Sequence, residues 1–250
     1  MIPMHKYANP TRFLKLANRI LPWSIGAMVI LFGYGLYLSF FYSPEDYQQG
    51  QTVRIMYIHV PTAWISIQTY ILMAVASAAS IIWRHPLADI AAKSAAPIGL
   101  AFTALALITG SLWGKPMWGA WWVWDARLTS VLIQLFLYIG YISIWQAIED
   151  QSKASRAAAI LALVGIINVP IIKFSVNWWN TLHQPASIMR MGGPSIDGSM
   201  LAPLFYMFGG FMAYFITILL WRMKAELSAR KLQTMKFNLA YQNEETGNHD

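Results

Sequence analysis

Two histidines stand in aromatic surroundings and have the chemistry of metal ligands. His59 lies in the segment MYIHVPTAW, and His183 lies in the segment NWWNTLHQP. A neutral imidazole is a good ligand for iron, and two imidazoles from separate segments can bind one metal ion from opposite sides. A single histidine near a membrane border is more often a hydrogen-bonded structural residue, because the imidazole is amphipathic. The chain has no cysteine, so any metal ligand must be a histidine, a methionine or a carboxylate.

The segment WGKPMWGAWWVWD, residues 113–125, concentrates flat aromatic surface. Its five tryptophans are Trp113, Trp118, Trp121, Trp122 and Trp124. Tryptophan is enriched at the borders of a membrane, so an interfacial anchor is the simplest alternative explanation. A border alone does not explain why seven of the twelve tryptophans, with Trp178 and Trp179 included, fall in two segments on one side. A flat aromatic surface beside two imidazoles favours haem as the ligand.

Aromatic stacking by itself would hold such a ligand weakly. Burial of on the order of 100 Å² of indole surface contributes about 2.5 kcal/mol, so coordination by histidine has to add to it. The propionate carboxylates of haem favour basic partners, and arginine can bind them through two hydrogen bonds. Four basic residues are available near these segments: Arg54, Lys115, Arg127 and Arg190. Asp125 and Arg127 have an alternative structural role, in which they pair with each other or with backbone N–H groups.

The spacing of the tryptophans predicts a short helix over residues 116–126, lying along the membrane border. At about 100° per residue, one face of this helix would carry Trp118, Trp121, Trp122 and Asp125. A proline at position 116 is suited to the first turn of such a helix.

The proline that follows His59 by two positions predicts a break in the chain. Pro61 disfavours the helical conformation at Val60, because the residue before a proline is sterically restricted to extended backbone. We therefore expect His59 to lie just outside the second membrane span.

The remaining sequence has the composition of an integral membrane protein. Hydrophobic residues make up 57% of the 250 residues and charged residues only 12%, which excludes an ordinary soluble domain. Six apolar stretches are near the ~20 residues that a membrane-spanning helix needs. They cover residues 21–42, 64–83, 95–112, 128–147, 157–176 and 201–221. The predicted fold is therefore all-α, with six transmembrane helices and a short tryptophan-rich helix on the outer face.

The distribution of basic residues predicts the orientation. With both termini inside, 13 of the 18 lysines and arginines fall in inner segments, as the positive-inside rule requires. Residues 1–222 then form the membrane domain, with segment 113–127 outside, and residues 223–250 form a cytoplasmic tail. The tail is polar and ends in NEETGNHD, so we expect its last residues to be disordered.

The segment WGKPMWGAWWVWDARLTS resembles the tryptophan-rich WWD signature of the proteins that handle haem during cytochrome c maturation. Together with YIHVPTAW, NWWNTLHQP and six spans, it makes residues 20–222 similar to the CcmC family. The resemblance implies a bacterial inner-membrane subunit that holds haem b transiently and without a covalent bond at the periplasmic face. It also implies that His59 and His183 are the axial ligands of the haem iron.

The resemblance further implies a set of partners. The subunit would present haem to the haem chaperone CcmE, within a complex that contains the CcmA ATPase, CcmB and CcmD. The sequence agrees, because the closest approach to a Walker A motif, GSLWGKP, lacks one residue between the glycines and has proline at the magnesium-binding position. Nucleotide binding must therefore come from a partner, and this chain is not expected to be an enzyme.

Two other functions are consistent with these residues. The tryptophan-rich signature also occurs in larger haem lyases, but those have a second haem site inside the membrane, and no histidine lies in the middle of a span here. A haem permease is the other alternative, since uniformly apolar spans neither support nor exclude a path for haem between helices.

Overall fold

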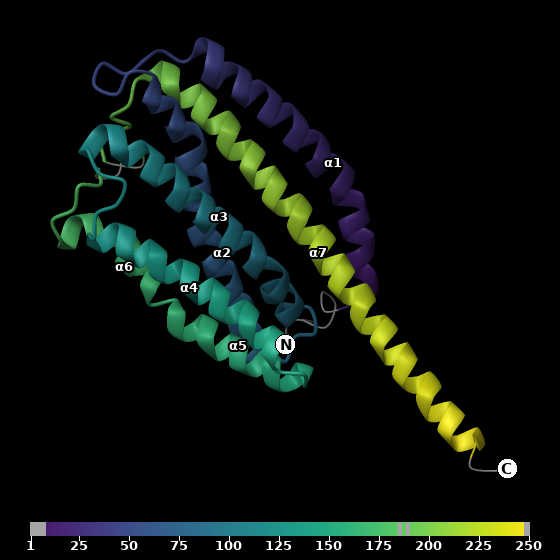
Figure 1. The fold of residues 1–250 in the computed structure, drawn as a ribbon. Helices are drawn as coiled ribbons and strands as arrows, with labels where there is room; N and C mark the ends of the chain where they lie inside the picture. Colours follow the sequence, from purple (N-terminus) through teal and green to yellow (C-terminus); the bar gives the residue numbers. More distant parts are fainter. Residues whose placement is uncertain (1–8, 185–186, 189–190, 248–250) are drawn as a thin grey trace.

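A computed structural model describes residues 9–184, 187–188 and 191–247, and it is built from helices (Figure 1). The helices are α1 (Pro10–Tyr37), α2 (Met56–Trp83), α3 (Ala88–Trp118), α4 (Ala126–Ala147), α5 (Gln151–Gly165), α6 (Asn168–Trp178) and α7 (Gly198–Gly247). A π-helical turn, Leu38–Tyr42, extends α1, and a 3-10 turn, Gln51–Ile55, leads into α2. Among the described residues, β structure is limited to one isolated bridge between Asp46 and Gly50.

Six helical stretches of the described chain are long and apolar enough to cross a membrane, which confirms the predicted fold class. They are Pro10–Tyr42, Gln51–Trp83, Ala88–Trp118, Ala126–Ala147, Gln151–Trp178 and Gly198–Ala240. The fifth stretch combines α5 and α6, which meet at a short turn. Asn168 begins α6, and its side-chain amide donates to the carbonyl oxygen of Ser130 on α4, 2.9 Å away.

The helices pack as neighbours in a single bundle. α1 lies along α7, α2 lies along α3, and α4 lies between α3 and α5. Figure 1 shows that the connections after α1, α3 and α6 gather at one end of the bundle. We call this the loop end, and the opposite end, where α1 begins and α7 finishes, the terminal end.

Close contacts between small and large residues fix α2, α3 and α4 against one another. Tyr138 of α4 is fully buried, and its hydroxyl donates to the carbonyl oxygen of Ser66 on α2 over 2.7 Å. The Tyr138 ring lies directly over Gly99 of α3, where a Cβ atom would overlap it. Glycine at position 99 therefore sets how closely α4 approaches α3.

The helix α7 reaches into the C-terminal segment whose last residues were expected to be disordered. α7 continues as one helix to Gly247, and only residues 248–250 of the tail lie outside the described residues. Ion pairs stabilise its first polar turns: Lys93 of α3 pairs with Glu226 at 2.7 Å, and Asp89 of α3 pairs with Arg230 at 2.7 Å. Within α7, Arg230 also pairs with Glu226 at 2.9 Å. The polar composition of the tail does not reveal Asp89 and Lys93 as partners, because they are far away in sequence.

The predicted helix over residues 116–126 is wrong. Residues 116–118 are the end of α3, and residues 119–125 are not helical. Gly119 ends α3 in the left-handed conformation, with φ of 74°, and its N–H donates to the carbonyl oxygen of Lys115. Asp125 then starts α4, because its carboxylate accepts from the N–H of Leu128 over 2.8 Å. The helix-ending residue Gly119 and the helix-capping residue Asp125 therefore outweigh the helical spacing of the tryptophans.

The predicted chain break at Val60 is also wrong, because α2 begins at Met56 and passes through Pro61. A proline inside a helix removes one backbone hydrogen bond. Near it, the Thr62 hydroxyl lies 2.8 Å from the carbonyl oxygen of Ile58 and 3.0 Å from that of His59. Such a hydroxyl helps a membrane helix to tolerate proline. His59 is therefore a helical residue near the start of α2.

Candidate functional site

The His59 side chain points from α2 toward the facing surface of α3. Its Nδ1 lies 3.1 Å from the carbonyl oxygen of Ala106 and 3.1 Å from the hydroxyl of Thr109. The Thr109 hydroxyl also lies 2.7 Å from the carbonyl oxygen of Leu105, to which it donates. The Trp113 ring packs edge-on against the imidazole, with 5.6 Å between ring centroids and 76° between planes.

These contacts determine which nitrogen of His59 carries the proton. A carbonyl oxygen can only accept, so Nδ1 must donate its N–H to Ala106. In the neutral imidazole, Nε2 then carries the lone pair. Nε2 has no hydrogen-bond partner within the described part of the chain, so this lone pair is available to a metal ion.

The close approach of His59 to α3 depends on a glycine. A Cβ atom at Gly110 would lie 2.9 Å from Cε1 of His59 and 3.4 Å from its Nδ1. In proteins, a Cβ atom essentially never lies closer than 3.0 Å to an atom of another side chain. Any larger residue at position 110 must therefore move the imidazole.

His183 also has its Nδ1 beside a backbone carbonyl oxygen, but it lies in a loop and not in a helix. It lies in the connection between α6 and α7, and its Nδ1 is 2.9 Å from the carbonyl oxygen of Gln184. Its backbone N–H donates to the hydroxyl of Thr181 over 3.1 Å. Nδ1 again must be the donor, which leaves the lone pair on Nε2. Burial and, after it, the positive charge of Arg127 lower the pKa of His183, so the imidazole favours its neutral form.

The two histidines approach each other in space. His59 and His183 are close enough to interact electrostatically, and each interacts with Arg127 of α4. Asp125, which precedes α4, interacts with His183 as well. The structure thus brings together four of the predicted site residues from three separate regions of the sequence.

Three polar atoms near the start of α4 are buried without a partner among the described residues. They are Nε1 of Trp122, Oδ2 of Asp125 and Nε of Arg127. The other carboxylate oxygen of Asp125 caps α4, so the backbone alternative from the sequence is the one observed; no ion pair joins Asp125 to Arg127 in the described chain. Buried polar atoms without partners are rare, and each needs an explanation.

The tryptophans do not form one flat surface. Trp122 and Trp124 meet edge-to-face, with centroids 5.5 Å apart, and Trp124 is 75% exposed. Trp118 is half-buried and lies over Gly114 of its own helix. Trp113 is also half-buried, and its indole N–H donates to the side-chain oxygen of Gln49 over 2.8 Å. Trp113 therefore has a packing role beside His59.

Trp121 remains on the surface, 55% exposed, and a hydrogen bond fixes its backbone. Its carbonyl oxygen accepts from the hydroxyl of Ser111 over 2.7 Å. Trp178 and Trp179 are about as exposed and meet edge-to-face at 5.7 Å. Exposed indoles thus border both the 119–125 segment and the connection that carries His183.

The other basic candidates are less suitable as ligands. The Lys115 ammonium donates to the carbonyl oxygen of Gly119 over 3.0 Å and lies 5.8 Å from the centre of the Trp121 ring. Arg54 lies beside Ser43, and its buried Nε has no partner among the described residues. Arg190 lies outside the described residues.

Sequence reasoning missed the residues of α3 that hold His59. The apolar stretch that contains Ala106, Thr109 and Gly110 predicts a membrane span and nothing more specific. Their spacing is a weak signal, since positions 106, 109 and 110 share one helical face. Gln49, the partner of Trp113, has no sequence signal, because it belongs to a loop.

A family model described as Heme exporter protein C matches residues 3–238 of this chain. The chain belongs to the heme exporter protein C family. The match covers all six spans and both histidine segments, and it confirms the family that the tryptophan-rich segment predicted.

Relatives in the heme exporter protein C family match over most of their length. Heme exporter protein C of Bradyrhizobium diazoefficiens is 59% identical over 229 residues, which are 92% of this chain and 87% of the relative. The protein of the same name from Escherichia coli K12 is 47% identical over 221 residues, 88% of this chain and 89% of the relative. The protein of the same name from Haemophilus influenzae is 44% identical over 224 residues, which are 90% of this chain and 91% of the relative.

Proposed function

We propose that this chain binds haem at the loop end of the bundle and presents it to a haem chaperone. Membership of the heme exporter protein C family implies a role in haem export for cytochrome c maturation. The finer proposal concerns the site: His59 and His183 coordinate the iron from its two sides, and aromatic residues of the 113–125 segment cover the porphyrin.

One observation carries this proposal. Nδ1 of each imidazole faces a backbone carbonyl oxygen, so each Nε2 has a free lone pair. Orientation of a histidine ligand by a hydrogen bond from its other nitrogen is the usual arrangement at metal sites. When bound, haem supplies the iron that both Nε2 atoms coordinate.

The unpartnered atoms beside the histidines fit the rest of a haem molecule. A propionate carboxylate can accept from Nε of Arg127 and from the indole N–H of Trp122, and both donors are buried without a partner in the described chain. Arg127 is the preferred propionate partner, because it interacts electrostatically with both histidines. Trp121 and Trp124 are exposed and available to cover an apolar face.

A subunit that passes its ligand on must bind it with moderate affinity. Half-exposed indoles and a histidine on a loop are consistent with release. The loop end then faces the periplasm, and the subunit works in the inner membrane with CcmA, CcmB and CcmD to load haem b onto CcmE. The covalent chemistry belongs to the chaperone, and ATP hydrolysis belongs to CcmA.

The ligand assignment is tested by the absorption spectrum of the purified full chain with added haem. The parent is expected to show six-coordinate, low-spin haem, and the double variant His59→Ala, His183→Ala is expected to lose it. His85→Ala is the matched control, because His85 lies between α2 and α3 at the terminal end. An unchanged low-spin spectrum in the double variant rules out the assignment.

Presentation to the chaperone needs a second measurement. The haem-loaded chain, mixed with purified CcmE, is expected to lose its low-spin spectrum as the chaperone gains haem. Thioether bond formation between haem and apocytochrome by this chain alone would instead identify a lyase.

A further inference from the structure

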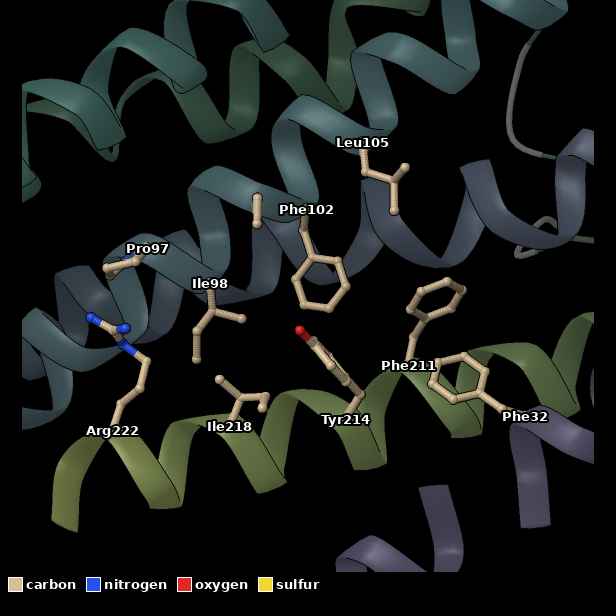
Figure 2. Close-up of a pocket in the computed structure, with 10 residues that line it drawn as sticks. Phe32, Pro97, Ile98, Phe102, Leu105, Phe211, Tyr214, Ile218 and Arg222 are labelled. Carbon is tan, nitrogen blue, oxygen red and sulfur yellow. The ribbon is translucent and has the colours of Figure 1, made fainter. Parts of the chain in front are cut away.

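An apolar groove between α3 and α7 lies away from the histidines. It has a volume of about 320 Å³, and Phe32 of α1 closes one end of it (Figure 2). Hydrophobic side chains such as Phe102, Leu105 and Phe211 line most of its length. The polar side chains that line it are those of Tyr214 and Arg222, and Arg222 stands at the end opposite Phe32.

The groove has the length of one leaflet of a bilayer. Phe211 and Arg222 are 11 positions apart on α7, which is about 16 Å at 1.5 Å per residue. Half of a hydrocarbon core of about 30 Å is about 15 Å. Arg222 follows the uncharged stretch 201–221 and precedes Lys224, so its guanidinium lies at the border between hydrocarbon and headgroups.

Arg222 retains capacity to bind an anion. Its Nε donates to the carbonyl oxygen of Ser94 over 3.1 Å, which positions the side chain against α3. Its terminal nitrogens have no partner among the described residues. Four charged side chains on the neighbouring turns of α3 and α7 form ion pairs with one another and not with Arg222: Asp89, Lys93, Glu226 and Arg230.

We propose that this groove is a binding site for a phospholipid of the leaflet at the terminal end. The acyl chain lies along the groove beside Leu105, Phe211 and Tyr214, and the phosphate accepts hydrogen bonds from Arg222. A lipid matches both features of the groove, the length of one leaflet and a cation at its end. A transmembrane helix of a partner would extend through both leaflets and needs no cation at that depth.

The test uses phosphatidylglycerol that carries a photoactivatable group on its acyl chain. Nanodiscs containing the full chain and this lipid are irradiated, and cross-linked residues are mapped by mass spectrometry. The same is done with membranes from cells that contain the chain and its natural partners. Cross-links to Leu105, Phe211 and Tyr214 are expected in both preparations.

Three variants locate the lipid. Ala101→Trp fills the groove and is expected to abolish these cross-links, since Ala101 lines it. Arg222→Ala is expected to reduce them about fivefold at low lipid concentration, because one basic residue near a membrane surface contributes about 1 kcal/mol. Lys224→Ala is the matched control and is expected to change nothing, because its ammonium donates to Asn18 over 2.6 Å.

Two outcomes overturn the proposal. Cross-linking that persists unchanged in Ala101→Trp and Arg222→Ala comes from ordinary bilayer lipid around the protein. Cross-linking in nanodiscs but not in native membranes means that a partner helix fills the groove. If Ala101→Trp does not yield a monodisperse protein, the loss or persistence of cross-linking in Arg222→Ala alone tests whether lipid binds in the groove.

Discussion

The orientation of His59 depends on α3 and not on the neighbours of His59 in sequence. The carbonyl oxygen of Ala106 fixes the tautomer, and Gly110 leaves room for the ring. Small residues in a membrane helix let a neighbouring helix approach its backbone closely. Gly110 therefore positions His59.

Gly110→Ala is expected to weaken haem binding. The added methyl group displaces the imidazole, and overpacking of this kind costs about 1–3 kcal/mol, so the dissociation constant should rise by about fivefold to a hundredfold. Haem titration of the purified variant, followed by its absorption spectrum, measures the effect. Gly33→Ala on α1 is the matched control, because no atom lies within 4 Å of a Cβ there. Equal affinities in both variants would show that the ring does not need this contact.

The pKa of His183 should depend on Arg127. Burial is the main cause of its lowered pKa and the charge of Arg127 is the second, so Arg127→Gln is expected to raise the pKa only part of the way to about 6.5. NMR of the haem-free chain with ¹⁵N-labelled histidine measures this. Arg54→Gln serves as the control, because the charge of Arg54 is not among the causes of the shift.

The same pKa shift gives His183 a defined effect on stability. As the pH falls below about 6.5, the unfolded chain takes up this proton before the folded chain does. The contribution of His183 therefore lowers the free energy of unfolding between pH 6.5 and the lower pKa of the folded state. In the His183→Ala variant this part of the pH dependence should disappear.

At the scale of helices, tight contacts in the core determine where the site elements stand. α2 carries His59, and α4 begins directly after its capping residue Asp125. Both helices pack against α3. The Tyr138 ring over Gly99 and the Tyr138 hydroxyl on Ser66 fix α4 to both α3 and α2. A shift of α4 would move Arg127 relative to His59.

Gly99→Ala is expected to destabilise the protein by about 1–3 kcal/mol, because the new methyl group overlaps the Tyr138 ring in a closely packed core. Thermal unfolding in detergent, followed by tryptophan fluorescence, measures the loss. Gly26→Ala lies on α1 with nothing within 4 Å of the new atom, so it should be neutral or slightly stabilising. A Gly99→Ala variant as stable as Gly26→Ala would mean that α3 and α4 can separate without penalty.

At the scale of the whole molecule, the bundle separates two kinds of surface. The loop end holds the histidines and the tryptophan-rich segment, and the terminal end holds the ion pairs of α3 and α7. The excess of lysine and arginine in segments of the terminal end favours a cytoplasmic position for that end. With that orientation, we expect the proposed haem site to face the periplasm.

The absence of cysteine makes this orientation directly testable. Gln48→Cys places a single thiol at the loop end, and Ser152→Cys places one at the terminal end; both positions are exposed. In intact spheroplasts, a membrane-impermeant thiol reagent is expected to label Gln48→Cys only. Ser152→Cys should react after the membrane is permeabilised. The reverse pattern would place the histidines in the cytoplasm.

The sequence by itself determined the fold class, the six spans, the family and the two histidines of the candidate site. Hydrophobicity summed over about 20 residues decides whether a segment crosses a membrane, and this sum is a local property. The tryptophan-rich segment and the histidine segments are local patterns as well.

Only the tertiary structure decided where the helices around these residues end and which partners their side chains have. In the structure, Gly119 caps the end of α3 and Asp125 caps the start of α4, whereas the tryptophan spacing predicts one helix across this segment. The tertiary structure also gave His59 its carbonyl partner on α3 and held the polar turns of α7 by ion pairs. Those contacts join residues far apart in sequence, and they exist only once the helices have packed, so no local pattern records them.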